Sequence, residues 1–111
     1  MKIFQILLSL LFISFFPVNA QKIVFTPQWT PQSQFAGYYA ALENGYYAEL
    51  GLDVEIVHPS TSYSSMSMLE EGTTDITTCE LIQALFAADR GVRLVNLLQT
   101  TQHSTLVLVS R

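Results

Sequence analysis

The stretch that most constrains the fold of this chain is residues 28–57, QWTPQSQFAGYYAALENGYYAELGLDVEIV. It follows a short β-prone run at residues 22–25 and opens with a polar, proline-bearing loop. Apolar side chains then recur at steps of four, three and four, which predicts one face of a helix; they are Phe35, Tyr39, Leu42 and Tyr46. Gly51 is expected to end this helix, and residues 52–57 are predicted to form a second strand.

A strand, a helix and a strand in so short a span predict a βαβ unit. Such a crossover connects parallel strands and is almost always right-handed. The loop at residues 28–34 is therefore expected at the carboxyl edge of the sheet, where open α/β sheets bind their ligands.

The first twenty residues are predicted to be a secretory signal peptide. Lys2 gives a positive start, residues 3–16 are mostly apolar, and small residues precede an expected cleavage after Ala20. A membrane anchor is the alternative, but the apolar run is shorter than the roughly 20 residues that a spanning helix needs. Residues 21–111 can then hold at most one small exported domain, expected without stable membrane insertion.

Charge and cysteine content exclude several classes of protein. The formal net charge is −4 and no basic run occurs, which argues against binding to nucleic acid or to anionic lipid. Cys79 is the only cysteine, so the chain has no intramolecular disulfide.

The rest of the chain continues the alternation of strands and helices. A second helix is expected from N-cap candidates at residues 60–62 to about Glu71, and a third, capped by Thr77 and Glu80, ends near Arg90. Its buried stripe is predicted to be Leu81, Ile82, Leu85 and Phe86. Further strands are predicted at residues 75–78, 92–98 and 105–109. The order β-α-β-α-β-α-β-β predicts an α/β fold with a doubly wound parallel sheet.

Three loops are expected at the ligand-binding edge, at residues 28–34, 58–62 and 77–80. Two are rich in hydroxyl groups and lead into helix N-termini, and the first carries Trp29. Together they suit a flat, polar, heteroaromatic ligand that stacks on a ring. The candidate ligand-binding residues are Trp29, Tyr38, Ser60, Thr61 and Thr78.

Each candidate has a plainer interpretation. Trp29 is as compatible with packing as with a ligand platform, and position on the helix favours packing for Tyr38. Residues 60–62 also suit helix capping alone. His58 and His103 are interpreted as loop residues, and Cys79 as a buried, inert thiol.

The sequence offers no positive sign of catalysis. It contains no glycine-rich phosphate loop, no cluster with metal-ligand spacing and no paired catalytic carboxylates. No cofactor and no metal are therefore expected.

Residues 28–57 resemble the opening of periplasmic substrate-binding proteins of the thiamine-precursor, sulfonate and nitrate group. The shared pattern is a W-x-P loop, an aromatic A-G-x-Y-x-A helix and a G-L-D-V strand start, and it continues more loosely through Arg90-Gly91-Val92. The loop with Trp29 and Pro31 is most similar to the branch that binds the pyrimidine precursor of thiamine.

This resemblance implies a type II periplasmic-binding-protein-like lobe that delivers a small ligand to an ABC importer. It also implies that the chain corresponds to only the first part of lobe one, so that contacts with a permease lie in other regions. Similar domains serve as the periplasmic sensor of hybrid histidine kinases, which is one alternative. Aliphatic sulfonate or nitrate binding and a non-functional gene fragment are others.

Eukaryotic pyrimidine synthases resemble residues 75–91. They carry a lysine that holds pyridoxal phosphate and, four residues on, a histidine; Cys79 and Gln83 occupy these positions here. Because cysteine cannot form the lysine Schiff base, the resemblance implies binding and not catalysis.

Overall fold

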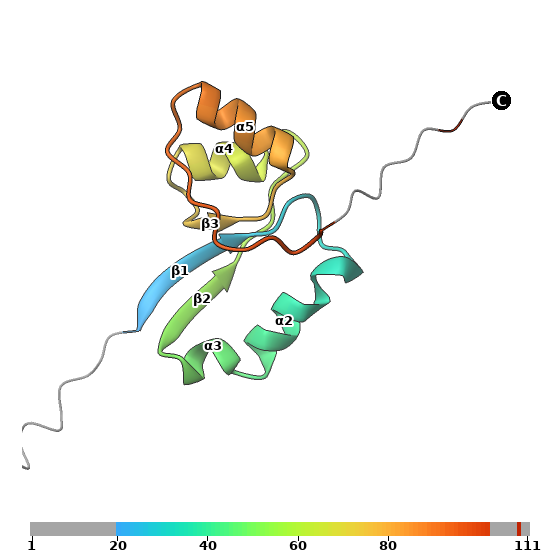
Figure 1. Ribbon diagram of the computed structural model, residues 1–111. Coiled ribbons are helices and arrows are strands. Elements are labelled where there is room, and N and C mark those ends of the chain that lie inside the picture. Colours follow the sequence, from blue (N-terminus) through green and yellow to red (C-terminus); the bar gives the residue numbers. More distant parts are fainter. Residues whose placement is uncertain (1–19, 103–108, 110–111) are drawn as a thin grey trace, which may run out of the picture. The chain divides into compact units, whose positions relative to one another are not determined.

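The computed structural model describes residues 20–102 and residue 109 (Figure 1). The described residues fall into two compact units, the first ending at Cys79 and the second beginning at Glu80. The expected leader at residues 1–20 and the expected strand at 105–109 lie outside the described residues, apart from Ala20 and Val109. The elements of the first unit are β1 (Gln21–Thr26), the 3-10 helix η2 (Ser33–Phe35), α2 (Ala36–Glu43), α3 (Tyr46–Glu49), β2 (Leu52–Ile56), α4 (Ser65–Glu70) and β3 (Ile76–Thr77). The second unit contains α5 (Leu81–Asp89).

The sheet of the first unit has three parallel strands in the order β2-β1-β3. β1 pairs with β2 from Gln21 opposite Leu52 to Phe25 opposite Ile56. It pairs with β3 at Phe25 opposite Ile76 and at the following residue pair. The predicted parallel βαβ unit is therefore confirmed, with β1 in the centre of the described sheet.

Polar side chains extend the short pairing of β1 with β3. The backbone N–H of Val24 donates to Oδ2 of Asp75 at 2.8 Å, and the hydroxyl of Thr77 donates to the carbonyl of Thr26 at 2.7 Å. The fully buried Thr26 hydroxyl donates to Oγ1 of Thr74 at 2.9 Å. These bonds hold a two-residue strand in register where few ladder hydrogen bonds are available.

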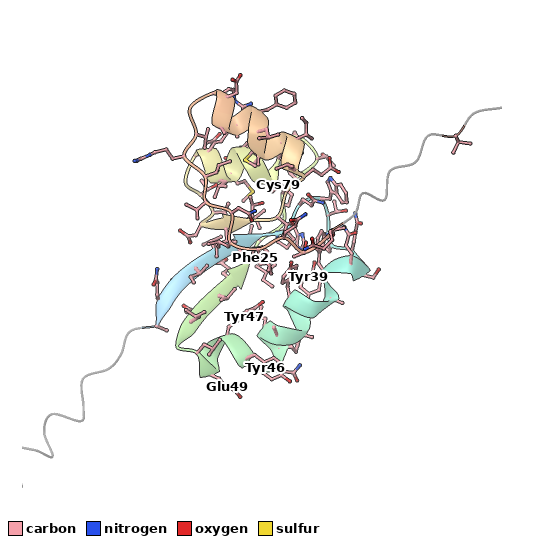
Figure 2. All side chains as sticks on the ribbon, viewed as in Figure 1. Phe25, Tyr39, Tyr46, Tyr47, Glu49 and Cys79 are labelled. Atoms are coloured by element: carbon pink, nitrogen blue, oxygen red, sulfur yellow. The ribbon has the colours of Figure 1, made fainter. Side chains whose placement is uncertain are left out.

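The helix predicted to run as far as Gly51 is broken in two. Asn44 ends α2, and Gly45 follows with a φ of 75°, a left-handed conformation that glycine adopts without steric cost. The turn rotates the apolar face, so that Leu42 and Tyr46 are 41% and 56% exposed. Tyr47 is half-buried instead, on the side of α3 toward β2 (Figure 2), and burial raises its pKa.

The core of the first unit gathers around the end of β1. Phe25 and Phe35 are only 7% and 5% exposed, and the ring of Tyr38 meets that of Phe25 edge-on with centroids 4.8 Å apart. Met66 and Met68 of α4 are also buried. Burial of one such side chain contributes roughly 1.5–3 kcal/mol to folding, and this cluster fixes α2 beside the sheet.

The second helix of the chain begins later than the sequence suggests. The N-cap of α4 is Ser64, whose hydroxyl accepts from the backbone N–H of Ser67, and not a residue of the 60–62 triplet. Several serines in succession offer the same capping chemistry. The difference is set by burial, because starting after Ser64 places Met66 and Met68 in the core.

The second unit departs most from the sequence prediction. Its helix is capped by Glu80, with the side chain of Gln83 accepting from the Glu80 backbone N–H at 3.2 Å, and not by Thr77. The four predicted stripe residues are exposed, from Ile82 at 51% to Leu81 at 75%. The strand predicted at residues 92–98 is not formed, and these residues have no regular secondary structure. Within residues 20–102, no helix is long and apolar enough to cross a membrane.

Candidate functional site

The parallel register brings the ends of all three strands of the sheet to one edge. Phe25 lies opposite both Ile56 and Ile76, so β1, β2 and β3 finish at the same level. The segments of the first unit that follow them are residues 27–32, 57–64 and 78–79. The predicted gathering of loops at the carboxyl edge is therefore confirmed, and this set of segments is called the carboxyl edge below.

A hydrogen bond joins the first and third of these segments. The backbone N–H of Gln28 donates to Oγ1 of Thr78 at 2.9 Å. The Thr78 hydroxyl acts as acceptor in this bond, so its own proton is still available to donate. Among the described residues, the buried Oε1 of Gln28 has no hydrogen-bond partner, which leaves an acceptor at the same point.

A second connection joins the first and second segments through His58. Its Nδ1 lies 3.2 Å from the carbonyl oxygen of Trp29, and its Nε2 lies 2.8 Å from the hydroxyl of Tyr39 on α2. From the sequence alone, His58 is interpreted as a loop residue without a role in the site. The available signal was a histidine that directly follows the predicted strand at residues 52–57 and precedes Pro59.

Trp29 stands at the exposed end of the first segment. Its side chain is 49% exposed, and its φ of 64° makes it the one non-glycine residue with a positive φ in the described part of the chain. Such a conformation is uncommon for a bulky residue and often marks a functional site. The indole is therefore open to a stacking partner and is held in a strained backbone.

Tyr38 has a packing role. Besides its contact with Phe25, its ring stacks at 6.4 Å from that of Phe35, and the side chain is half-buried. This agrees with the interpretation that favoured packing, while a contact between Tyr38 and a ligand stays a prediction.

The hydroxyl-rich turn after β2 is solvent-exposed. Ser60, Thr61 and Ser62 are all exposed, and the hydroxyls of Ser60 and Ser62 lie 3.4 Å apart. Ser60 also forms an isolated antiparallel bridge with Tyr63. The turn thus offers hydroxyl groups to solvent at the carboxyl edge, close in sequence to His58.

Cys79 and Gln83 show ordinary structural behaviour. Cys79 is half-buried, and burial raises the pKa of its thiol, which disfavours the reactive thiolate. Gln83 completes the cap of α5. No cluster of three or more histidine, cysteine or acidic residues suited to a metal ion occurs within residues 20–102.

The fold and this edge together define a class: a parallel α/β unit whose loops gather where open sheets bind small molecules. The chain belongs to the family described as NMT1/THI5 like, which matches residues 32–111 and has a periplasmic-binding-protein-like fold. Trp29 lies just ahead of the matched residues.

Individual relatives are more distant. The chain is 26% identical over 102 residues to the formylaminopyrimidine-binding protein of Halalkalibacterium halodurans, an alignment covering 86% of this chain and 31% of that protein. It is 28% identical over 74 residues to the 4-amino-5-hydroxymethyl-2-methylpyrimidine phosphate synthases THI11 and THI5 of Saccharomyces cerevisiae, covering 67% of this chain and 22% of each synthase. The chain therefore spans less than a third of the length of these relatives. No solved structure shows a significant match.

Proposed function

We propose that this chain is the first part of an exported, non-catalytic solute-binding protein whose ligand is a thiamine pyrimidine precursor. The observation that carries the proposal is the carboxyl edge, where Trp29 is exposed and hydrogen bonds tie its loop to Thr78 and His58. The named activities of the relatives support the ligand class, since one binds a formylaminopyrimidine and others make a related pyrimidine phosphate.

The chemistry of the edge suits an aminopyrimidine. A flat heteroaromatic ring stacks on an exposed indole, and an exocyclic amine donates hydrogen bonds. The unpartnered Oε1 of Gln28 is an acceptor, and the hydroxyls of Thr78, Ser60 and Thr61 serve as donors or acceptors. In this proposal Trp29 is the platform, these groups form hydrogen bonds with the ring edges, and Tyr38 is a further candidate for ligand contact.

We propose binding over catalysis because of Cys79 and Gln83. A thiol whose pKa is raised by burial is a poor nucleophile, and it cannot form a Schiff base with an aldehyde cofactor. The Gln83 side chain is engaged in capping α5. The proposed location is the periplasm, and the proposed partner is an ABC permease that receives the ligand for thiamine biosynthesis.

Calorimetric titration tests this function. The chain is titrated with 4-amino-5-hydroxymethyl-2-methylpyrimidine and with the formylaminopyrimidine, and in parallel with thiamine, riboflavin, nitrate and a small aliphatic sulfonate. Saturable heat with the pyrimidines alone is the expected result. Binding of the sulfonate or nitrate without binding of either pyrimidine would contradict the proposal.

A further inference from the structure

The side chain of His58 connects three parts of the first unit that are distant in sequence. It follows β2, it meets the Trp29 carbonyl after β1, and it meets the Tyr39 hydroxyl on α2 (Tyr39 is labelled in Figure 2). The Phe35 ring lies 6.4 Å from the imidazole, centroid to centroid. The imidazole therefore lies between the Trp29 loop and two rings of the helical layer.

The sequence around His58 fixes where this imidazole can lie. Val57 donates its N–H to the Phe25 carbonyl at 3.0 Å, which continues the β1–β2 ladder up to the residue before His58. Pro59 follows and is buried. A residue that precedes proline is confined to extended conformations, so His58 has little backbone freedom.

The hydrogen-bond partners determine which ring nitrogen carries the proton. The Trp29 carbonyl can only accept, so Nδ1 of His58 must be protonated to bond with it. In the neutral ring Nε2 is then an acceptor, and the Tyr39 hydroxyl donates to it. The contacts thus specify the Nδ1–H tautomer and a fixed ring orientation.

Trp29 needs such an anchor because its backbone is strained. With a φ of 64° and a half-exposed side chain, little burial holds its conformation in place. Conformations of this kind persist only where surrounding contacts over-determine them. The Gln28–Thr78 bond holds the residue before Trp29, and the His58 bond holds the carbonyl of Trp29 itself.

We propose that His58 is a positioning residue that fixes the backbone, and hence the indole, of Trp29 through its Nδ1–H. The importance of this for ligand binding rests on the function proposed above, but the anchoring is a property of the free protein. His58 acts through Trp29 and need not touch the ligand.

Two amide variants test the two hydrogen bonds of the imidazole separately. The amide nitrogen of His58→Asn can replace Nδ1–H toward the Trp29 carbonyl, whereas the longer His58→Gln places its amide where Nε2 meets Tyr39. Because Trp29 is the only tryptophan, its indole N–H signal in NMR and its fluorescence report this one residue. Tyr39→Phe removes the other hydrogen bond and is the matched control.

We expect the Trp29 indole signal to move, and acrylamide quenching to rise, in His58→Ala and His58→Gln. In His58→Asn both the indole signal and the quenching should stay close to those of the wild type. In Tyr39→Phe they should lie between the wild-type values and those of His58→Gln. Identical signals in all variants, or equal effects of asparagine and glutamine, would overturn the proposal. Imidazole nitrogen shifts of the unmutated chain, separated from those of His103 with His103→Ala, give a test that requires no change at His58: the Nε2–H tautomer would contradict it.

Ligand titration distinguishes this inference from the proposed function. If the proposed function and the positioning role of His58 both hold, His58→Gln binds 4-amino-5-hydroxymethyl-2-methylpyrimidine about tenfold more weakly than His58→Asn. A tenfold loss of affinity is the effect expected for one lost hydrogen bond. If no pyrimidine binds but the indole signals follow the expected order, only the function fails. If pyrimidine binds equally well to both variants, with an unmoved indole, only the positioning role fails.

Discussion

The backbone N–H of Gln28 and the hydroxyl of Thr78 lie 2.9 Å apart, joining the segment after β1 to the segment after β3. Fifty residues separate them in sequence. The bond depends on both strands ending at the same level of the sheet, which the register of Phe25 with Ile76 ensures. It is therefore a direct sign of how the fold assembles the carboxyl edge.

Thr78→Val should destabilise the chain by about 1–3 kcal/mol, because a part-buried backbone N–H loses its acceptor while the side-chain volume is kept. Urea unfolding followed by circular dichroism measures the change. Thr78→Ser keeps the hydroxyl and is the control, with a loss below about 1 kcal/mol expected. Equal losses for the two variants would show that the hydroxyl is not what matters.

Replacement of glycine by alanine should change the stability of the chain in opposite directions at two positions of the helical segment. Gly45 has a positive φ, so Gly45→Ala should cost about 1–2 kcal/mol of folding free energy. Gly37 lies inside α2 with open space around it, so Gly37→Ala should stabilise by about 0.5–1 kcal/mol. Thermal unfolding of both variants checks this. A stabilising Gly45→Ala would mean that α2 and α3 form one continuous helix.

The Cys79 thiol should react slowly in the folded chain. Burial raises its pKa above the ordinary 9.0, so a smaller fraction is thiolate at pH 8 than in the unfolded chain. The stabilisation linked to the neutral thiol is complete below pH 9.0 and is lost as the pH rises through the folded-state pKa. Iodoacetamide alkylation at pH 8, with and without urea, measures the difference. Faster alkylation of the folded chain would contradict it.

The sequence predicted the first unit well because its signals are local. A short β-prone run predicted β1, and a second extended run after Gly51 predicted β2. Gly51, with a φ of 73°, ends the helical segment as expected. Parallel pairing then followed from the helical connection between the two strands. Since Trp29 and Thr78 directly follow predicted parallel strands, the sequence predicts both at the same edge of the sheet.

The remaining features depend on tertiary contacts that periodicity does not reveal. The pattern Leu81, Ile82, Leu85 shows that one face of α5 is apolar, but it does not show what covers that face, and these side chains are exposed here. The role of His58 was missed because its partners, Trp29 and Tyr39, are 29 and 19 residues away. Packing of the core likewise decides why Ser64, and not a residue of the 60–62 triplet, is the N-cap of α4.

Trp29 should matter for binding and little for stability. Its side chain is half-exposed, so Trp29→Ala should change the free energy of unfolding by less than about 1 kcal/mol. The same variant should lose pyrimidine binding, because the stacking platform is gone. Urea unfolding and calorimetry on one preparation measure both quantities. A variant that unfolds under native conditions would show that Trp29 is a packing residue instead.

The central claim is that the carboxyl edge, with Trp29 as the stacking platform, receives a pyrimidine. Titrating the nitrogen-15-labelled chain with 4-amino-5-hydroxymethyl-2-methylpyrimidine tests it most directly, because the single indole N–H signal reports on Trp29 alone. We predict a saturable shift of this signal together with shifts of the backbone signals of Gln28 and Thr78. An indole signal that does not move, while signals elsewhere in the chain do, would contradict the account.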